Sequence, residues 1–334
     1  MRTFFYERAA SPTEAIHAAT AITDGNTSYL AGGTTLVDLM KLDVMRPSAI
    51  VDINPLQHTH LGRIDFGPNG LRLGALVRMA EAADHPEIRN QYPVIAQSLQ
   101  LAASQQLRNM ASLGGNVLQR TRCTYFRDVA YTECNKRMLG SGCAAVGGVN
   151  RRHAVLGTSD HCIATYAGDF AQALIALDAA VEIAGLRGNR TIPFAALHRK
   201  PEDTPDKETT LHPAEMIISF LVPAAGWTRR SLYLKVRDRD SYEFALASAA
   251  VAIDQQKGIV RNARIALGGV ATVPWRAMEA EAALRGKPIN EQNAATAADA
   301  AFSSAKGYGH NDFKIELGKR TLRRAVLQAA ALEI

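Results

Sequence analysis

The four cysteines constrain this 334-residue chain more than any other feature, because all of them lie between positions 123 and 162. They are Cys123, Cys134, Cys143 and Cys162, separated by ten, eight and eighteen residues. Zinc sites are usually built from closely spaced cysteine knuckles, which these gaps do not resemble. An irregular loop of thiols among Arg and Lys favours an iron–sulfur cluster, because thiolate ligands carry negative charge. A zinc site, disulfides and buried structural thiols remain open from spacing alone.

The same part of the chain carries the excess of positive charge. The net charge is +6, and residues 105–155 contain eight Arg or Lys against two acidic residues, so this segment accounts for all of it. Such a patch is typical of binding to nucleic acid, to a phosphate-bearing cofactor or to an anionic cluster. Aromatic residues make up only 6% of the chain and few lie in the patch. We therefore expect no nucleic-acid partner, since single strands bind on aromatic stacking surfaces.

Length and composition restrict the class of protein further. At about 150 residues per domain, the length predicts two domains. Hydrophobic residues make up 47% and charged residues 21%, which excludes a largely disordered or collagen-like chain. No uncharged apolar run approaches the roughly eighteen residues of a membrane span, so we expect none. The first residues have no long apolar core, and we expect no secretory signal there.

Hydrophobic periodicity and turn residues predict a chain of mixed helices and strands. A capping box at Ser11–Glu14 predicts a helix that begins at Pro12. We place the main domain boundary near residue 225, where strands followed by packed helices predict an α+β unit. Further strands are expected at 29–31, 49–53, 71–75, 180–184, 216–222, 231–237 and 261–270, with a long apolar run at 244–253, and helices are expected from Leu36 and over 87–106, 169–179, 276–285 and 312–331.

Two of the four Gly-Gly pairs have a context that suggests an anion site. Gly32-Gly33-Thr34-Thr35 lies between an expected strand and an expected helix, where backbone N–H groups and two hydroxyls can contact a phosphate. Gly114-Gly115-Asn116 repeats this chemistry together with Ser112. Neither pair forms a dinucleotide-binding fingerprint or a P-loop. Together they indicate a diphosphate held from two sides by backbone.

Six segments in one order across nearly the whole chain resemble a known family. They are YLAGGTTLVDLMK, LGALVRMAE, LRNMASLGGNVLQ, ATYAGDFAQALIALDAAVEI, LYLKVRDRDSYEFAL and ALGGVATVPWRAMEAEAALRGK. The chain resembles the FAD-binding subunit of the molybdenum hydroxylases, the xanthine dehydrogenase and carbon monoxide dehydrogenase superfamily. In many members the connection between the second glycine pair and the following Asp is short. Here it holds all four cysteines, which is similar to the FAD subunit of bacterial three-subunit aldehyde oxidoreductases.

The resemblance implies an α+β fold with a two-lobed FAD domain of the PCMH type, related to vanillyl-alcohol oxidase. This domain would span residues 1–225, with lobes at about 1–56 and 57–225 and the cysteine insertion at about 117–165. A C-terminal domain of the CO dehydrogenase flavoprotein type would span 226–334. Asp169 would hold FAD hydroxyls and Lys235 would lie near the flavin ring, where a cation stabilises reduced flavin. The other FAD contacts implied are Ser28, Tyr29, Leu30, Ala31, Gly32, Gly33, Thr34, Thr35, Leu36, Ser112, Gly114, Gly115 and Asn116.

For the insertion, the resemblance implies a [4Fe–4S] cluster held by Cys123, Cys134, Cys143 and Cys162. The nearby His153 and His161 are interpreted as packing or surface residues rather than as ligands. No catalytic residue is expected in this chain, since substrate oxidation in the family occurs at a molybdenum cofactor on a large subunit. Electrons would pass through [2Fe–2S] clusters of a small subunit to FAD and then to an external acceptor, in a heterotrimer or its dimer.

Two positions depart from the family pattern. Thr35 stands where relatives often have Asp, Asn or Ser, and Asp169 lacks the Pro that often precedes it. Aldehydes are the first expected substrates, and xanthine or another N-heterocycle is the alternative. Two other classes remain, a zinc-stabilised nucleotide-binding protein without redox activity and a stand-alone flavin oxidase. The expected compartment is the periplasm, reached by co-export with the small subunit, with the cytoplasm as the alternative.

Overall fold

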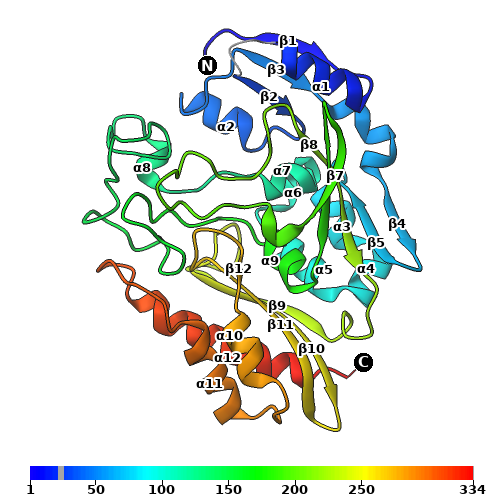
Figure 1. Cartoon of the computed structure of the whole chain (residues 1–334), viewed down its shortest axis with the longest axis vertical. Helices are drawn as coiled ribbons and strands as arrows, with labels where there is room; N and C mark the ends of the chain where they lie inside the picture. Colours follow the sequence, from blue (N-terminus) through cyan, green and yellow to red (C-terminus); the bar gives the residue numbers. More distant parts are fainter. Residues whose placement is uncertain (22–25, 334) are drawn as a thin grey trace.

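The computed structural model describes residues 1–21 and 26–333, and every structural statement below concerns these residues. The chain forms two lobes, one after the other, and a C-terminal domain below them (Figure 1). Helices and strands occupy separate layers in each part, which confirms the α+β fold class predicted from the sequence. None of the described helices has the length and apolar character needed to cross a membrane.

The N-terminal lobe is a three-stranded parallel sheet in the order β1-β3-β2. The predicted cap at its first helix is present, because the Glu14 backbone N–H donates to Ser11 Oγ at 3.1 Å. The Glu14 carboxylate accepts from the Ala10 N–H at 2.8 Å, one residue earlier than in a standard capping box. The elements are β1 (Phe5–Arg8), α1 (Pro12–Ala21), β2 (Thr27–Leu30), α2 (Leu36–Lys41) and β3 (Ala49–Asp52), followed by the 3-10 turns η1 (Asn54–His58) and η2 (His60–Gly62).

The second lobe is a five-stranded antiparallel sheet in the order β4-β5-β8-β6-β7, covered by helices. Three aromatic rings join the helix layer to the sheet, with Phe170 and Phe194 packed edge-on against Phe220 at centroid distances of 5.7 and 6.0 Å. The elements are β4 (Ile64–Gly67), β5 (Gly70–Gly74), α3 (Met79–Asp84), α4 (Pro86–Gln91), α5 (Pro93–Gln100), α6 (Gln105–Met110), α7 (Leu113–Val117), α9 (Phe170–Ala176), β6 (Ala180–Gly185), β7 (Gly188–Pro193), η3 (Phe194–Ala196) and β8 (Met216–Pro223).

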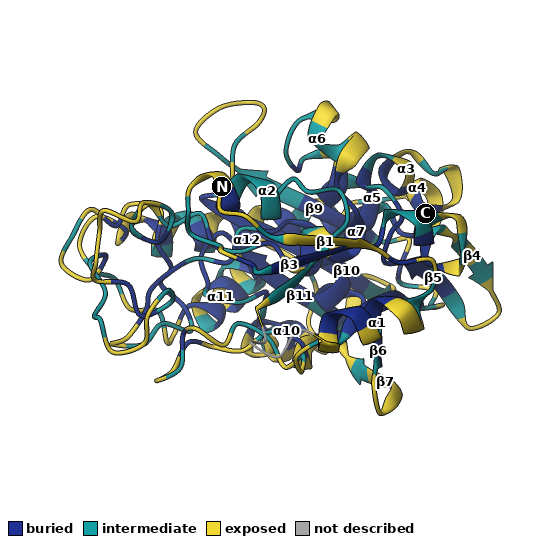
Figure 2. Cartoon of the chain, turned by 90° about the horizontal axis from the view of Figure 1, so that it is seen from above, coloured by how far each residue is buried: buried dark blue, intermediate teal, exposed yellow. Residues whose placement is uncertain are grey.

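The C-terminal domain is a four-stranded antiparallel sheet in the order β12-β11-β10-β9, backed by three helices. Its central strands are buried, as the dark β10 and β11 in Figure 2 show, in contrast to the exposed β1 and α6. The helix α11 was not predicted, because its sequence is mostly Ala and offers no periodic row of large apolar residues. The elements are β9 (Ser231–Val236), β10 (Ala247–Gln256), β11 (Ile259–Gly268), β12 (Trp275–Arg276), α10 (Met278–Leu284), α11 (Glu291–Ala301) and α12 (Phe313–Ala330).

The cysteine insertion lies between α7 and α9 and contains one short helix, α8 (Thr124–Arg127). In Figure 1 it extends to the left of both lobes as a set of loops around α8. A small apolar cluster lies here, in which Phe126 and Cys134 pack with Leu39 of α2, and Val155 and Leu156 join the core of the C-terminal domain. Most of the insertion is therefore irregular chain that needs contacts with the rest of the molecule to keep its shape.

The aromatic contact in the second lobe gives a first prediction. We expect Phe220→Ala to lower the free energy of unfolding by about 3–5 kcal/mol, because Phe220 is fully buried and its removal leaves a cavity. Phe5→Ala is the matched control, since Phe5 also lies in a strand but is 77% exposed, and it should change stability little. Urea denaturation of the purified chain measures both. Equal effects for the two variants would contradict the packing described here.

Candidate functional site

The two glycine loops predicted to hold a diphosphate lie against each other in the structure. A side chain at Gly32 would place its Cβ 2.0 Å from the Met110 carbonyl oxygen, so the close approach of the loops requires glycine. Gly33 has φ of +73°, which also favours glycine. On the other loop, Ser112 caps α7 and its Oγ accepts from the Gly115 N–H at 3.2 Å. The loops thus expose backbone and hydroxyl groups rather than large side chains.

A cavity opens between these two loops, and we call it the glycine-loop cavity. Most of the predicted FAD contacts line it, whereas Leu30, Asn116, Asp169 and Lys235 do not. The predicted residues in its wall are Ser28, Tyr29, Ala31, Gly32, Gly33, Thr34, Thr35, Leu36, Ser112, Gly114 and Gly115. Sequence reasoning missed Met45, Ile53, Ala75, Leu76, Leu118, Arg120, Glu215, Met216 and Ile217, which also line it. Of these, only Arg120 carried a signal, as part of the basic segment.

The glycine-loop cavity has the chemistry of a site for a diphosphate-bearing cofactor. Asn116 lies next to it, and its Oδ1 is buried without a hydrogen-bond partner, which leaves an acceptor free for a ligand hydroxyl or N–H. The Thr34 and Thr35 hydroxyls and the N–H groups at the start of α2 lie in the opposite wall. Backbone donors at a helix start are a common anion site. The cradle therefore fits the pyrophosphate of FAD.

Two further cavities extend this space toward the cysteines. The middle cavity shares Met45, Leu118 and Arg120 with the glycine-loop cavity. It also shares Thr121, Thr165 and Tyr166 with a third cavity, which we call the thiol-side cavity. Because neighbouring cavities share lining residues, we refer to the three together as the trench. The thiol-side cavity is further lined by Arg122, Cys123, Thr124, Val149, Arg151, Arg152, His153, Ala167, Phe244, Ala245, Leu246 and Gly269.

Asp169 and Lys235 meet in a buried ion pair. Lys235 Nζ donates to Asp169 Oδ2 at 2.8 Å and to the Leu101 carbonyl at 3.0 Å, and the two side chains are 1% and 5% exposed. The Tyr233 hydroxyl donates to Asp169 Oδ1 at 2.6 Å. The Asp169 carboxylate thus neutralises Lys235 in this structure. The predicted contacts of both residues with FAD stay predictions, and the pair joins α9 of the FAD lobe to β9.

The four thiols lie in one part of the structure, within the insertion. Cys134 and Cys143 face each other in an antiparallel bridge, and none of the four forms a disulfide. Cys123 lies within electrostatic range of Cys134 and Cys162, and Cys162 lies within that range of Cys134 and Cys143. As they stand, no three or more His, Cys, Asp or Glu side chains in the described part of the chain are grouped to hold a metal ion.

Burial and nearby donors act on the pKa of the thiols in opposite directions, and burial is the larger effect. Burial raises the pKa of the Cys123 thiol to about 12 and that of the Cys162 thiol to about 11. Against this, the backbone N–H groups of Tyr125 and Phe126 donate to Cys123, and the Ala164 N–H donates to Cys162 Sγ at 3.4 Å. The Lys136 ammonium also lowers the pKa of Cys162. Backbone donors and a nearby cation are typical neighbours of metal-bound thiolates.

The two histidines of the insertion differ in their positions. His161 is exposed, as expected for a surface residue. His153 is buried, and its Nε2 lies 3.1 Å from Cys123 Sγ. Burial, reinforced by the nearby Lys314, lowers the pKa of His153 to about 4. The interpretation of His153 as a packing residue is therefore incomplete, because it contacts a thiol directly.

Several basic residues of the insertion form ion pairs with carboxylates elsewhere in the chain. Arg122 and Arg127 pair with Asp38 of α2 at 3.1 and 2.9 Å. Arg120 and Lys136 pair with Glu208, and these cations hold the pKa of Glu208 below its usual range although burial alone would raise it. The excess charge thus ties the insertion to other parts of the molecule.

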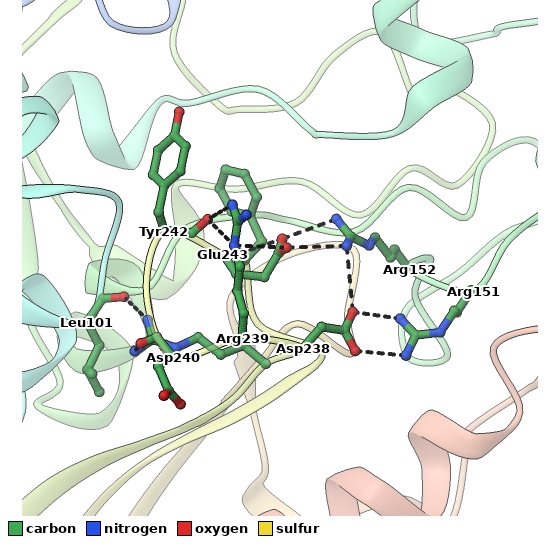
Figure 3. A network of polar contacts seen from close by, with 10 residues as sticks. Leu101, Arg151, Arg152, Asp238, Arg239, Asp240, Tyr242 and Glu243 are labelled. Carbon is green, nitrogen blue, oxygen red and sulfur yellow. Dashed lines mark hydrogen bonds and ion pairs between the residues drawn. The ribbon is translucent and has the colours of Figure 1, made fainter.

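A third set of ion pairs connects the insertion to the loop after β9. Figure 3 shows Arg151 and Arg152 reaching toward Asp238 and Glu243. Arg151 binds Asp238 through two hydrogen bonds of 2.8 and 2.9 Å, and Arg152 binds Glu243 at 3.1 Å. These pairs are largely exposed, so each contributes little to stability by itself. Their effect is to fix the insertion beside the loop that follows Lys235.

The fold and these sites define a class of protein. Residues 2–225 match the family model described as the FAD binding domain in molybdopterin dehydrogenase, and residues 232–329 match that of the CO dehydrogenase flavoprotein C-terminal domain. The chain therefore belongs to the FAD-binding subunits of the molybdenum hydroxylase family. It is an oxidoreductase subunit that binds FAD, as the resemblance implied.

Individual relatives are similar over nearly the whole chain. The aldehyde oxidoreductase FAD-binding subunit PaoB of Escherichia coli K12 is 44% identical over 332 residues, which cover 99% of both chains. The glyceraldehyde dehydrogenase medium chain of Sulfolobus acidocaldarius is 26% identical and covers 86% of this chain and 83% of its own. Among solved structures, carbon monoxide dehydrogenase from Hydrogenophaga pseudoflava has a chain with a TM-score of 0.75 at 25% identity, covering 98% of this chain and 97% of that one.

The close approach of the glycine loops gives a second prediction. We expect Gly32→Ala to reduce the flavin content at least about tenfold, because the added Cβ collides with the Met110 carbonyl and opens the cradle. Gly226→Ala is the matched control, since a Cβ at this exposed position meets no atom within 4 Å. Flavin absorbance per protein, measured on the purified chain after incubation with FAD, gives the ratio. Full flavin content in Gly32→Ala would exclude the cradle as the binding site.

Proposed function

We propose that this chain is the electron-transfer subunit of a molybdenum-containing aldehyde oxidoreductase. Electrons from the molybdenum centre would pass through [2Fe–2S] clusters to FAD in this chain and on to an external acceptor. The observation that carries the proposal is the combination, in one chain, of a glycine-loop cradle with four thiols in one insertion, none of them in a disulfide. FAD, when bound, supplies the capacity to store and release electrons.

Aldehydes are the substrates that the relatives favour. PaoB belongs to an aldehyde oxidoreductase and is the 44% identical relative, and the Sulfolobus chain belongs to a glyceraldehyde dehydrogenase. The putative xanthine dehydrogenase FAD-binding subunit XdhB of Escherichia coli K12 is 22% identical over a similar length. Xanthine or another N-heterocycle is therefore the second candidate.

The proposed occupant of the insertion is a [4Fe–4S] cluster. Three observations support it: none of the four thiols forms a disulfide, backbone N–H groups donate to two of them, and the side chains that approach them, Lys136 and His153, are nitrogen donors rather than carboxylates. Asn135 closes the loop around them, since its Oδ1 accepts from the Gly140 and Gly142 N–H groups and its Nδ2 donates to the His161 carbonyl. The proposed ligands are Cys123, Cys134, Cys143 and Cys162.

The residues of this chain would bind and orient FAD. The glycine loops and the Thr34 and Thr35 hydroxyls would hold the pyrophosphate, and the trench would guide the extended cofactor toward the thiol-side cavity. Asp169 and Lys235 would contribute from α9 and β9, where their buried pair fixes the two elements relative to each other. The wall of the thiol-side cavity contains Cys123, so a cofactor that reaches this cavity lies beside the proposed cluster ligands.

The proposed partners are a large subunit with the molybdenum cofactor and a small [2Fe–2S] subunit, in a heterotrimer or its dimer. The proposed compartment is the periplasm, reached by co-export with the small subunit, and the cytoplasm is the alternative. The two compartments are distinguished by fractionating cells that express the tagged chain, with and without the small subunit. A chain that stays in the cytoplasm in both cases would exclude co-export.

The cluster gives a third prediction. The purified complex should contain about four iron and four sulfide beyond those of the small subunit, together with FAD. Cys134→Ser should lose this additional iron and keep the flavin, whereas Gly32→Ala should lose flavin and keep the iron. Iron, sulfide and flavin assays on the same samples measure the two losses independently. Zinc in place of iron would overturn the cluster, and a complex without FAD would overturn the whole proposal.

The proposed reaction gives a fourth prediction. Anaerobic addition of an aldehyde should bleach the flavin absorbance of the complex, because electrons reach FAD from the molybdenum subunit. The isolated chain loaded with FAD should show no bleaching, since it has no substrate site of its own. Hypoxanthine is the comparison substrate. Bleaching by hypoxanthine and not by aldehydes would favour the second candidate, and bleaching of the isolated chain would favour a stand-alone oxidase.

A further inference from the structure

His153 is the residue of the insertion whose contact the function described so far does not explain. Its Nε2 lies 3.1 Å from Cys123 Sγ, within hydrogen-bond distance for a sulfur partner. The side chain is buried, with the residue 5% exposed, and its Nδ1 is also buried without a partner. A buried imidazole aimed at a thiol through one nitrogen has a defined orientation, which a residue that only fills space would not need.

We propose that His153 donates a hydrogen bond from Nε2 to the sulfur of Cys123 and thereby raises the reduction potential of the cluster in the insertion. This inference rests on the proposed function, since it requires that Cys123 is a cluster ligand. His153 acts through Cys123 and is a positioning residue in this sense. The inference assigns to His153 an effect on how readily the cluster accepts an electron.

The direction of the hydrogen bond follows from the chemistry of a ligating thiolate. A thiolate bound to iron has no proton, so the contact with His153 is a hydrogen bond only if Nε2 carries the hydrogen. A donor to the sulfur withdraws electron density and stabilises the reduced cluster, which carries more negative charge. Removing this donor therefore lowers the reduction potential.

The C-terminal domain fixes the backbone of His153 through hydrogen bonds. Lys314 of α12 is fully buried, and its Nζ donates to the backbone carbonyls of Arg152 at 3.2 Å, of His153 at 3.0 Å and of Gly269. Asn311, just before α12, donates from Nδ2 to the Ala154 carbonyl at 2.9 Å. The backbone on both sides of His153 is thus fixed by a domain that contributes none of the four cysteines.

Contacts within the insertion complete this support. The His153 N–H donates to the Asn150 carbonyl at 2.9 Å, and the Ala154 N–H donates to the Ile163 carbonyl, also at 2.9 Å. Ile163 directly follows Cys162, so the backbone that positions His153 over one thiol also borders a second thiol. These hydrogen bonds fix the backbone from which the imidazole extends to Cys123.

The test is a redox titration of the purified complex, monitored by electron paramagnetic resonance of the cluster. His153→Phe keeps a ring in the buried site and removes the N–H, so we expect full iron and flavin with a lower potential. The expected shift is about tenfold in the ratio of reduced to oxidised cluster, or about 59 mV for one electron. His153→Gln retains an N–H donor and should stay near the wild-type potential.

His161→Phe is the matched control, because His161 is exposed and adjoins Cys162 in the chain. It should leave the potential unchanged. An unchanged potential in a fully loaded His153→Phe complex would overturn the inference, and so would an equal fall in His153→Phe and His153→Gln, which would indicate packing instead of hydrogen bonding. If His153→Phe loses iron, His153→Gln decides: full iron at the wild-type potential supports the inference, and loss of iron overturns it.

Failure of the proposed function gives a different result. A wild-type complex without the additional iron would remove the cluster itself, and no variant would then have a potential to compare. A cluster that is present in the wild type, and whose reduction potential is the same in His153→Phe, would overturn only the inference about His153.

Discussion

The polar attachment of the cysteine insertion is the interaction on which both candidate sites depend. Near its end the insertion is held by burial, since Val155 and Leu156 belong to the core of the C-terminal domain, whereas the stretch around Phe126 and Cys134 has only a small buried cluster. Three groups of ion pairs add anchoring points, at Asp38 of α2, at Glu208 and at Asp238 with Glu243. A single exposed ion pair contributes little, but several pairs at separate anchoring points restrict the loop together. The segment that carries the thiols is therefore fixed by polar contacts as well as by its buried residues.

The buried pair of Asp169 and Lys235 has a comparable role between the lobes and the C-terminal domain. Two charges out of water are costly unless they meet in good geometry and are hydrogen-bonded. Here Tyr233 and the Leu101 carbonyl supply those additional bonds. The pair fixes β9 against α9, and the loop that follows β9 then reaches the arginines of the insertion (Figure 3). The strand that carries Lys235 is thus linked both to Asp169 and, through the loop after it, to the insertion.

Much of the fold was predictable from local sequence signals. The predicted helix at 312–331 is α12, and the apolar run at 216–222 is β8, because periodicity and composition were clear in both. The short strand β1 is exposed on all four residues, so it had no hydrophobic pattern to reveal it. The Ala-rich α11 could have been found from its cap, since Asn290 accepts from the Asn293 N–H at its start.

The sequence by itself determined the cofactor cradle and the group of thiols. The close contact of the two loops requires glycine, and a thiol site requires cysteine. Such requirements can be recognised from the residue types alone. The tertiary structure decided the partners of the arginines, the residues that the three cavities share and the contact of His153 with Cys123. These depend on residues far apart in the chain, such as Lys314 and His153, which are 161 positions apart. No local pattern encodes such a distance, since it results from how the domains pack.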